Sequence, residues 1–368
     1  MKFLGLSLIN HTPDPLTGHL SSTTERFREV VDSAVLFEQL GFDGFGVGER
    51  HHRPFISTSP PVVLAHIAAL TSEIRLFSAV TLLSILDPVR VAEDYATLDH
   101  LSNGRLEVII GKGNGPEQAE LFGLTREQQW ETTNENYRLL RRLWTEERVT
   151  WNGPRRPPLE DAVTLPRPLQ RPPRIWHGSA TSEQSVDLAA EFGDPLFSAN
   201  VTNPVEPYAE LVRYYRERWE YWGHDPADAY VGAGTAAYYS TPRSQDALDT
   251  YRPIFEARSA MQAQFGLDPV FHSVEDFAER SSALLGSPQQ IIDKVHHYHT
   301  QLGHSAMFIE SDSNGLTQAE HRDSLDRFAG EIAPALRSAL PDPPWPNSAR
   351  DPAGTAATGP RDVAEVAR

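Results

Sequence analysis

The chain has 368 residues, of which 39% are hydrophobic, enough to form the core of a sizeable globular protein. Its formal net charge of −17 repels phosphate backbones and anionic lipids, so we expect neither nucleic acid nor a membrane surface as a partner. The absence of cysteine excludes disulfides, thiolate nucleophiles and cysteine-ligated metal centres. No signal-peptide pattern and no apolar run of about 18 residues is found, which predicts a cytoplasmic protein.

Short apolar runs alternate with longer amphipathic stretches along most of the chain. The apolar runs predict strands at 3–9, 42–48, 75–83, 105–111, 174–177, 195–199, 229–239 and 305–310. The amphipathic stretches predict helices at 23–40, 60–71, 88–101, 126–147, 182–191, 204–222, 288–302 and 317–340. Boundary signals support these limits: Pro60 and Pro61 stand at a helix entry, and Asn103 and Gly104 end another helix.

This alternation predicts the fold class and the domain organisation. Eight β-then-α units without a break in composition favour one (β/α)8 TIM barrel over an open sheet, as a single domain over residues 1–340. A mostly helical stretch at about 243–285 follows the seventh strand and is expected to be an insertion. The segment 153–173 is rich in proline and is predicted to be a loop. The tail 341–368 has no periodicity and is expected to be disordered.

A dense polar cluster follows the second predicted strand. Function in such barrels lies at the carboxyl ends of the strands, so the residues after each strand are the first candidates. Glu49, Arg50, His51 and His52 stand here in sequence. One interpretation is a catalytic His51 oriented by Glu49, and the other is a solvated loop. Adjacent histidines on one loop rarely bind one metal ion and no HExxH motif is present, so we expect no metal site.

Two neighbouring strand ends offer a place for an anion. Gly111 and Lys112 begin a glycine-rich turn after the fourth strand, where glycine allows close backbone approach and lysine supplies a positive charge. Small and hydroxyl residues follow the fifth strand and open a helix whose amide groups can bind an anion; they are Gly178, Ser179, Ala180, Thr181 and Ser182. An ordinary helix cap also explains these serines. Lys112 on the preceding strand favours a phosphate site.

The motifs, taken in order, resemble the luciferase-like flavin monooxygenases. The likeness covers about residues 1–335 and is densest over 40–125. The segments that carry it are 40–52 (LGFDGFGVGERHH), 87–94 (DPVRVAED), 98–105 (LDHLSNGR) and 178–182 (GSATS). As a set in this order the motifs are specific, although none of them is so by itself.

The resemblance implies a cofactor site and a reaction. Ala79-Val80 would be a non-proline cis peptide beneath a flavin ring, and Lys112, Ser179 and Ser182 would hold the phosphate of FMN. His51 would face the reactive edge of the flavin. A separate flavin reductase would supply reduced FMN, which reacts with O2 so that one oxygen atom passes to a small organic substrate. The resemblance also implies a homodimer.

Two positions depart from the family pattern. The family usually has arginine where Lys112 stands, so bidentate phosphate binding is lost. Its histidine pair directly follows the glutamate, whereas Arg50 intervenes here. Either Arg50 takes the place of the first histidine, or the loop bulges and His51 takes it.

Two other functions stay open at this point. A deazaflavin-dependent oxidoreductase would transfer hydride on the same barrel, but the acidic tail of that cofactor needs several basic groups, and Arg50, Lys112 and Arg126 are a modest supply. A non-catalytic flavin-binding barrel would keep the phosphate site without the reaction. Retention of His51 argues against this second alternative.

Overall fold

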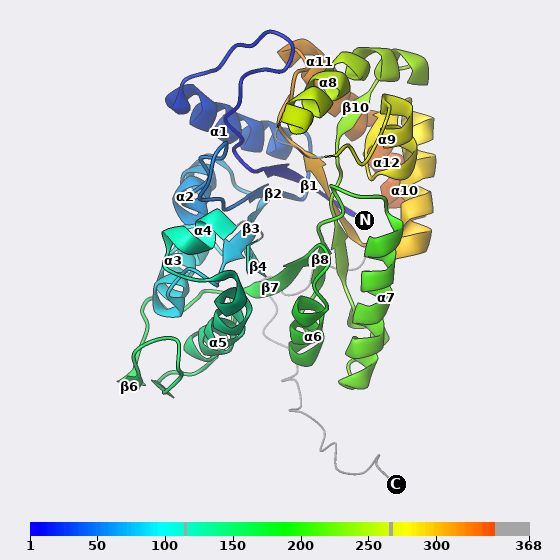
Figure 1. Ribbon diagram of the computed structural model, residues 1–368. Helices are drawn as coiled ribbons and strands as arrows, with labels where there is room; N and C mark the ends of the chain where they lie inside the picture. Colours follow the sequence, from blue (N-terminus) through cyan, green and yellow to red (C-terminus); the bar gives the residue numbers. More distant parts are fainter. Residues whose placement is uncertain (114–115, 265–267, 343–368) are drawn as a thin grey trace.

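The core of the fold is a closed barrel, in a computed structural model that describes residues 1–113, 116–264 and 268–342. Within these residues, eight parallel strands pair in the order β1-β12-β9-β8-β7-β4-β3-β2, and helices surround them (Figure 1). The predicted (β/α)8 barrel is confirmed. The barrel strands are β1 (Lys2–Ser7), β2 (Gly44–Val47), β3 (Arg75–Leu82), β4 (Leu106–Gly111), β7 (Arg174–Ser179), β8 (Leu196–Ser198), β9 (Val231–Ala233) and β12 (Ala306–Glu310).

The helices outside the barrel follow the predicted stretches within a few residues. They are α1 (Thr23–Gln39), α2 (Pro60–Leu70), α3 (Pro88–Leu101), α5 (Arg126–Thr145), α6 (Glu183–Phe192), α7 (Glu206–Tyr221), α10 (Pro288–Leu302), α11 (Gln318–Arg327) and α12 (Ala333–Ala339). Short elements are α4 (Pro116–Leu121), the 3-10 turn η1 (Pro226–Asp228) and the π turn η2 (Phe328–Ile332).

The sequence fixes several helix ends through local hydrogen bonds. Ser22 and Glu25 form a capping box at the start of α1, so that two backbone N–H groups without a helical partner are satisfied. Asp87 accepts from the Val89 N–H at the start of α3, and Pro88 occupies the first helical position, where it loses no hydrogen bond. The predicted limits of α3 are therefore correct to the residue.

The predicted seventh strand, 229–239, is wrong as one element. The chain forms β9 and then leaves the barrel before β10 (Tyr238–Ser240), which pairs in parallel with β11 (Leu284–Gly286) outside it. Thr235 lies between the two strands, and its hydroxyl donates to the carbonyl of Phe308 at 3.0 Å. This tertiary bond ties the departing chain to β12, which a continuous apolar run in the sequence does not reveal.

The insertion after the seventh strand is mostly helical, as predicted. It contains α8 (Ser244–Gln264) and α9 (Val274–Arg280), and β11 closes it against β10. The segment predicted as a proline-rich loop, 153–173, is wrong in part, because β6 (Leu159–Ala162) pairs antiparallel there with β5 (Val149–Trp151). Residues 343–368 of the tail lie outside the described residues.

Hydrophobic side chains fill the barrel interior above a polar base. Glu107 lies inside the base, where it forms an ion pair with Arg75 at 2.5 Å and accepts from the indole N–H of Trp176 at 2.7 Å. Phe77 and Phe308 pack edge to face above them, at 5.6 Å between ring centroids. This packed interior gives the strand ends a rigid support.

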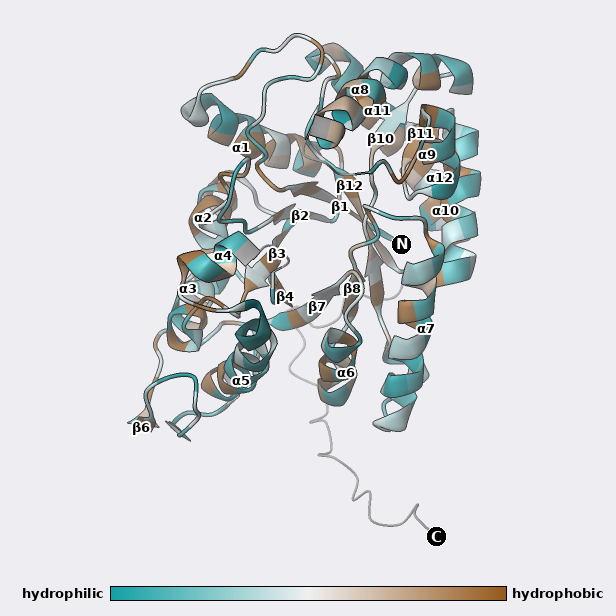
Figure 2. Cartoon of the chain, viewed as in Figure 1, coloured by the Kyte–Doolittle hydropathy of each residue, from teal (hydrophilic) through white to brown (hydrophobic). Residues whose placement is uncertain are grey.

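The outer helices separate the barrel from solvent. α10 carries mainly hydrophilic residues outward, while the strands carry hydrophobic residues (Figure 2). Its buried residues, which face the barrel, are Ile291, Val295, Tyr298 and Leu302. Among the described residues, no helix is both long and apolar enough to cross a membrane.

Candidate active site

The floor of the candidate site is formed by strand ends without large side chains. Gly111 ends β4 and Gly178 lies near the end of β7, and both strands flank the side chain of Val80. A Cβ added to Gly111 would lie 2.9 Å from Val80 Cγ2, and one added to Gly178 would lie 2.8 Å from Val80 Cγ1. Because real Cβ atoms do not approach so closely, glycine at both positions is what lets Val80 lie over the barrel interior.

The peptide bond between Ala79 and Val80 is cis, as the sequence resemblance implies. The ladder between β3 and β4 shifts its register between Ala79 and Thr81. Both Ala79 and Val80 are half-buried and pack on the hydrophobic cluster that fills the barrel. The result is a small apolar platform at the carboxyl end of the barrel, flanked by Gly111 and Gly178.

Glu49 holds His51 at one side of this platform. The Glu49 carboxylate is buried, with one oxygen accepting from the Leu82 N–H at 2.8 Å and the other 2.9 Å from His51 Nε2. A neutral His51 with its proton on Nε2 donates in this pair, which leaves Nδ1 for other partners. The His51 ring also meets the ring of Phe122 edge to face at 4.8 Å, and its backbone N–H donates to Gln118 Oε1 at 3.3 Å.

Arg50 has an aromatic neighbour. Its guanidinium lies over the ring of Phe55, 5.3 Å from the centroid, and its backbone N–H donates to Ser57. Burial lowers the pKa of Arg50. Of the three residues predicted to be catalytic, the structure therefore joins Glu49 with His51 and gives Arg50 a different environment.

The residues predicted to bind a phosphate lie on neighbouring strands. β4 and β7 pair in parallel with Ile110 opposite His177, and continuing this register places Lys112 beside Ser179. The carbonyl of Lys112 accepts from the Ser84 hydroxyl at 2.7 Å, which fixes its backbone, and its side chain is half-buried. A positive charge is thus held next to the start of α6.

Three hydroxyl residues at the start of α6 have different environments. Ser179 is buried, and its hydroxyl is used within the turn, where it donates to the Ser182 carbonyl at 3.1 Å and accepts from the Ser182 N–H at 3.0 Å. Ser182 caps the helix by accepting from the Ser185 N–H. Ala180 and Thr181 are exposed. The groups open to an anion are therefore those of Ala180 and Thr181, together with the helix start.

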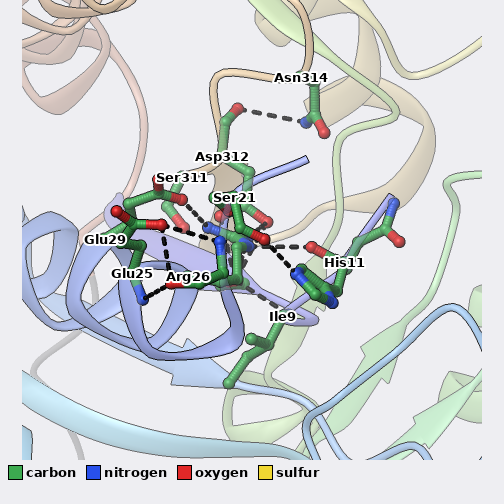
Figure 3. A network of polar contacts seen from close by, with 12 residues as sticks. Ile9, His11, Ser21, Glu25, Arg26, Glu29, Ser311, Asp312 and Asn314 are labelled. Atoms are coloured by element: carbon green, nitrogen blue, oxygen red, sulfur yellow. Dashed lines mark hydrogen bonds and ion pairs between the residues drawn. The ribbon is translucent and has the colours of Figure 1, made fainter. Parts of the chain in front are cut away.

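The opposite rim carries a polar network that the sequence analysis missed. Arg26 of α1 forms an ion pair with Asp312 at 2.7 Å (Figure 3), and Ser7 at the end of β1 donates to the same carboxylate at 3.0 Å. Glu310 ends β12 two residues earlier, and burial raises its pKa to about 7. A charged residue at a strand end was the signal that marked Glu49, and the same rule applied to the last strand would have found Glu310.

A hollow of about 500 Å³ lies elsewhere on the molecule. Tyr230, Arg216 and His299 contribute to its lining, and Ser305, which directly precedes β12, places it at the amino-terminal end of the barrel. Because chemistry in (β/α)8 barrels takes place at the carboxyl ends of the strands, we assign the candidate site to the platform at Val80.

Residues 1–305 match the family described as luciferase-like monooxygenase. The chain belongs to this family. The assignment confirms the resemblance seen in the motifs, and it agrees with the closed barrel. It also accounts for the agreement between the expected and the observed cis peptide at Ala79-Val80.

Relatives of this luciferase-like family member include named monooxygenases. The 4-hydroxyprotoasukamycin monooxygenase of Streptomyces nodosus subsp. asukaensis is 25% identical over 335 residues, which are 84% of this chain and 87% of the relative. The alkanal monooxygenase alpha chain of Photorhabdus laumondii subsp. laumondii is 26% identical over 255 residues, which are 67% of each chain.

Solved structures share the barrel over almost their whole length. A monooxygenase from Streptomyces bottropensis is 25% identical, with a TM-score of 0.78, and the match covers 91% of this chain and all of that one. The oxygenating constituent of 3,6-diketocamphane monooxygenase from Pseudomonas putida, solved in complex with FMN, is 19% identical. Its TM-score is 0.75, and the match covers 93% of this chain and 99% of that one.

Proposed function

We propose that this protein is a flavin-dependent monooxygenase that uses reduced FMN and O2 to oxygenate a small organic substrate. The observation that carries the proposal is the platform at Val80, which packs against Gly111 and Gly178, with the residues that we propose to bind an anion beside them. A planar ring needs a flat apolar surface, and a phosphate needs amide groups and a cation. These two surfaces lie next to each other at the ends of β4 and β7.

The space that the two glycines leave beside Val80 fits a bound FMN. A Cβ at Gly111 or Gly178 would displace Val80, so the glycines keep the platform low enough for a ring to approach. Lys112, with the exposed residues Ala180 and Thr181 at the start of α6, would hold the phosphate. When bound, FMN supplies the activation of O2 that no protein side chain offers.

Glu49 and His51 would hold and move a proton beside the ring. The carboxylate fixes the position of the imidazole and the tautomer with its proton on Nε2. Nδ1 of His51 would then accept a proton, or deliver one once the ring is charged. The Phe122 ring against His51 would help to exclude water from this position.

The named relatives support the oxygenation reaction. Each of the two described above is a monooxygenase, and one structural neighbour was solved with FMN. No dinucleotide-binding fingerprint occurs in the sequence, so we propose that a separate flavin reductase supplies the reduced FMN.

We also propose a homodimer. Large apolar side chains are exposed on α2 and α3 and on the segment after β6, namely Val62, Leu70, Leu101 and Leu165. We infer that these side chains form one apolar patch, and a contiguous exposed patch marks an association surface. Sedimentation velocity at micromolar concentration tests this proposal, and a monomer would contradict it.

Anaerobic binding of oxidised FMN, reduced FMN and the deazaflavin cofactor to the purified protein tests the main proposal. We expect reduced FMN to bind most tightly, and admission of O2 to the complex to give flavin reoxidation that a substrate alters. Preference for the deazaflavin would favour hydride transfer. Flavin binding without any reaction with O2 would identify a non-catalytic barrel.

A further inference from the structure

The last barrel strand carries an ionisable side chain on its inner face. Phe308 packs inside the barrel against Phe77 and Phe197, and successive side chains of a strand alternate between faces. Glu310 therefore also faces inward, one layer closer to the carboxyl end. Its side chain is half-buried, so part of it stays accessible.

Glu310 lies across the barrel from the proposed phosphate site. In the order of the closed sheet, β12 is separated from β4 by the same number of strands in either direction. A ligand anchored at Lys112 and extending over Val80 would therefore point toward Glu310. The space between the platform and Glu310 is where a substrate would meet the ring.

The insertion brings an arginine close enough to Glu310 for their charges to interact. α8 lies beyond the arrowhead end of β12 (Figure 1), and its Ile254 packs against the segment that follows β12, within 3.1 Å of a Cβ built on Gly315. Arg258 stands one helical turn after Ile254 and so shares its face. Its Nη1 donates to the hydroxyl of Tyr251 at 3.1 Å. A guanidinium has five N–H groups, so others remain for a ligand.

Charged groups from three elements act on the Glu310 carboxyl. Burial raises its pKa to about 7, against the attraction of Arg258 from α8, while the negative charge of Asp312 adds to the increase. The Asn314 side chain and Arg26 of α1 oppose it more weakly. Arg26 is itself paired with Asp312 (Figure 3). Below neutral pH, Glu310 is therefore a neutral hydrogen-bond donor.

We propose that Glu310 and Arg258 form a subsite that binds a carbonyl oxygen of the organic substrate, an assignment that rests on the proposed monooxygenase function. A protonated carboxyl and a guanidinium both donate hydrogen bonds, and a carbonyl oxygen accepts two. The substrate class that fits is a neutral molecule with a ketone, aldehyde or amide group. Donors matched to one acceptor discriminate strongly against an analogue that lacks it.

Ionisation of Glu310 weakens carbonyl binding at this subsite. The carboxylate can no longer donate, and its charge attracts the guanidinium of Arg258, so the carbonyl loses both donors. Carbonyl binding should therefore weaken as the pH rises through the pKa of Glu310. Binding of a hydrocarbon of the same shape should not change.

Acetophenone and ethylbenzene are matched probes for this subsite, because they share a skeleton and differ in the carbonyl. We would titrate each into the FMN-loaded protein and follow flavin fluorescence. We expect acetophenone to bind roughly tenfold more weakly at about pH 8.5 than at about pH 6, and ethylbenzene to bind equally at both. Glu310→Gln should bind acetophenone without pH dependence, because an amide N–H still donates. Arg258→Met should bind it more weakly at both pH values.

Three outcomes separate this inference from the proposed function. Failure of the wild type to bind FMN would refute the proposed function and this inference with it. FMN binding together with absent or pH-independent acetophenone binding would overturn the inference alone. The same holds if Glu310→Gln keeps the pH dependence of the wild type. Glu93→Gln is the matched control, because Glu93 is a half-buried carboxylate paired with Arg90 on α3, and it should behave as the wild type.

Discussion

Glu49 offers the sharpest test of the site, because one carboxylate makes two separate hydrogen bonds. It is 4% exposed, and its oxygens bind the Leu82 N–H and His51 Nε2 at 2.8 and 2.9 Å. Glu49→Ala leaves the Leu82 N–H without its acceptor, which costs about 1–3 kcal/mol. It also removes the hydrogen bond between the Glu49 carboxylate and His51, which contributes a similar free energy. We expect the free energy of unfolding to fall by about 3 kcal/mol, measured by urea denaturation.

Glu49→Gln separates stability from chemistry. The amide oxygen can still accept from Leu82, so we expect a loss of only about 1 kcal/mol in the free energy of unfolding. The amide nitrogen, however, donates to His51 Nε2 and forces the imidazole proton onto Nδ1. With Nδ1 protonated, a neutral His51 cannot accept a proton there, and we expect substrate oxygenation to fall by about 10²–10⁴-fold. Nitrogen-15 NMR of the histidines reports the tautomer directly.

Glu146→Gln is the matched control for both variants. Glu146 pairs with Arg142 on the surface of α5, and such a pair contributes about 0.5 kcal/mol or less. A free energy of unfolding for Glu49→Ala within about 0.5 kcal/mol of the wild type would contradict this role of the carboxylate. Full activity in Glu49→Gln, together with a changed tautomer of His51, would contradict the proposed role of Nδ1.

Three further variants test the cofactor site and the opposite rim. Lys112→Met should weaken FMN binding about tenfold and Lys112→Arg should strengthen it, since arginine binds phosphate in a bidentate manner; fluorescence titration measures both. Gly178→Ala should cost about 1–3 kcal/mol of stability and also weaken flavin binding, because the added Cβ would lie 2.8 Å from Val80. Glu310→Gln should be the more stable protein above pH 7, by about 3 kcal/mol at most in urea denaturation, because a pKa raised from 4.5 to about 7 opposes folding once the carboxyl must ionise.

Each of these variants has a contrasting result. If Lys112→Met binds FMN as tightly as the wild type does, and still binds riboflavin less tightly than FMN, the phosphate is held elsewhere. Gly123→Ala, at a left-handed turn with open space around its Cβ, separates backbone strain from the contact with Val80. For Glu310→Gln, the sign decides: the advantage must be absent below about pH 4.5, grow between there and about pH 7, and then stay constant.

Local patterns determined most of the secondary structure. The limits of α3 and α10 follow from proline at the first helical position, from the Asp87 and Ser287 caps, and from Gly303 in the left-handed conformation after α10. These signals act within one turn of helix, so a sequence contains them completely. The alternation of strands and helices then leaves the (β/α)8 barrel as the simplest closed arrangement, and the structure has it.

Only the tertiary structure decided where the seventh strand ends. The residues 229–239 form one apolar run, but the Thr235 bond to the Phe308 carbonyl ties the chain to β12 where β10 departs. Strand pairing depends on a partner far away in the chain, and β10 finds its partner in β11 at the far end of the insertion. Propensity cannot distinguish one long strand from two strands in different sheets.

The sequence identified the strand ends that carry the candidate site, but it did not determine the direction of the side chains. Glu49, Arg50 and His51 are consecutive, yet two of them pair and the third lies on Phe55. Glu310 is buried by the fold, and its charge interacts with that of Arg258, which the folded insertion brings near the end of β12. Beyond the last ladder hydrogen bond, periodicity no longer sets the backbone. Packing against distant elements then decides which groups meet, and that information exists only in the folded chain.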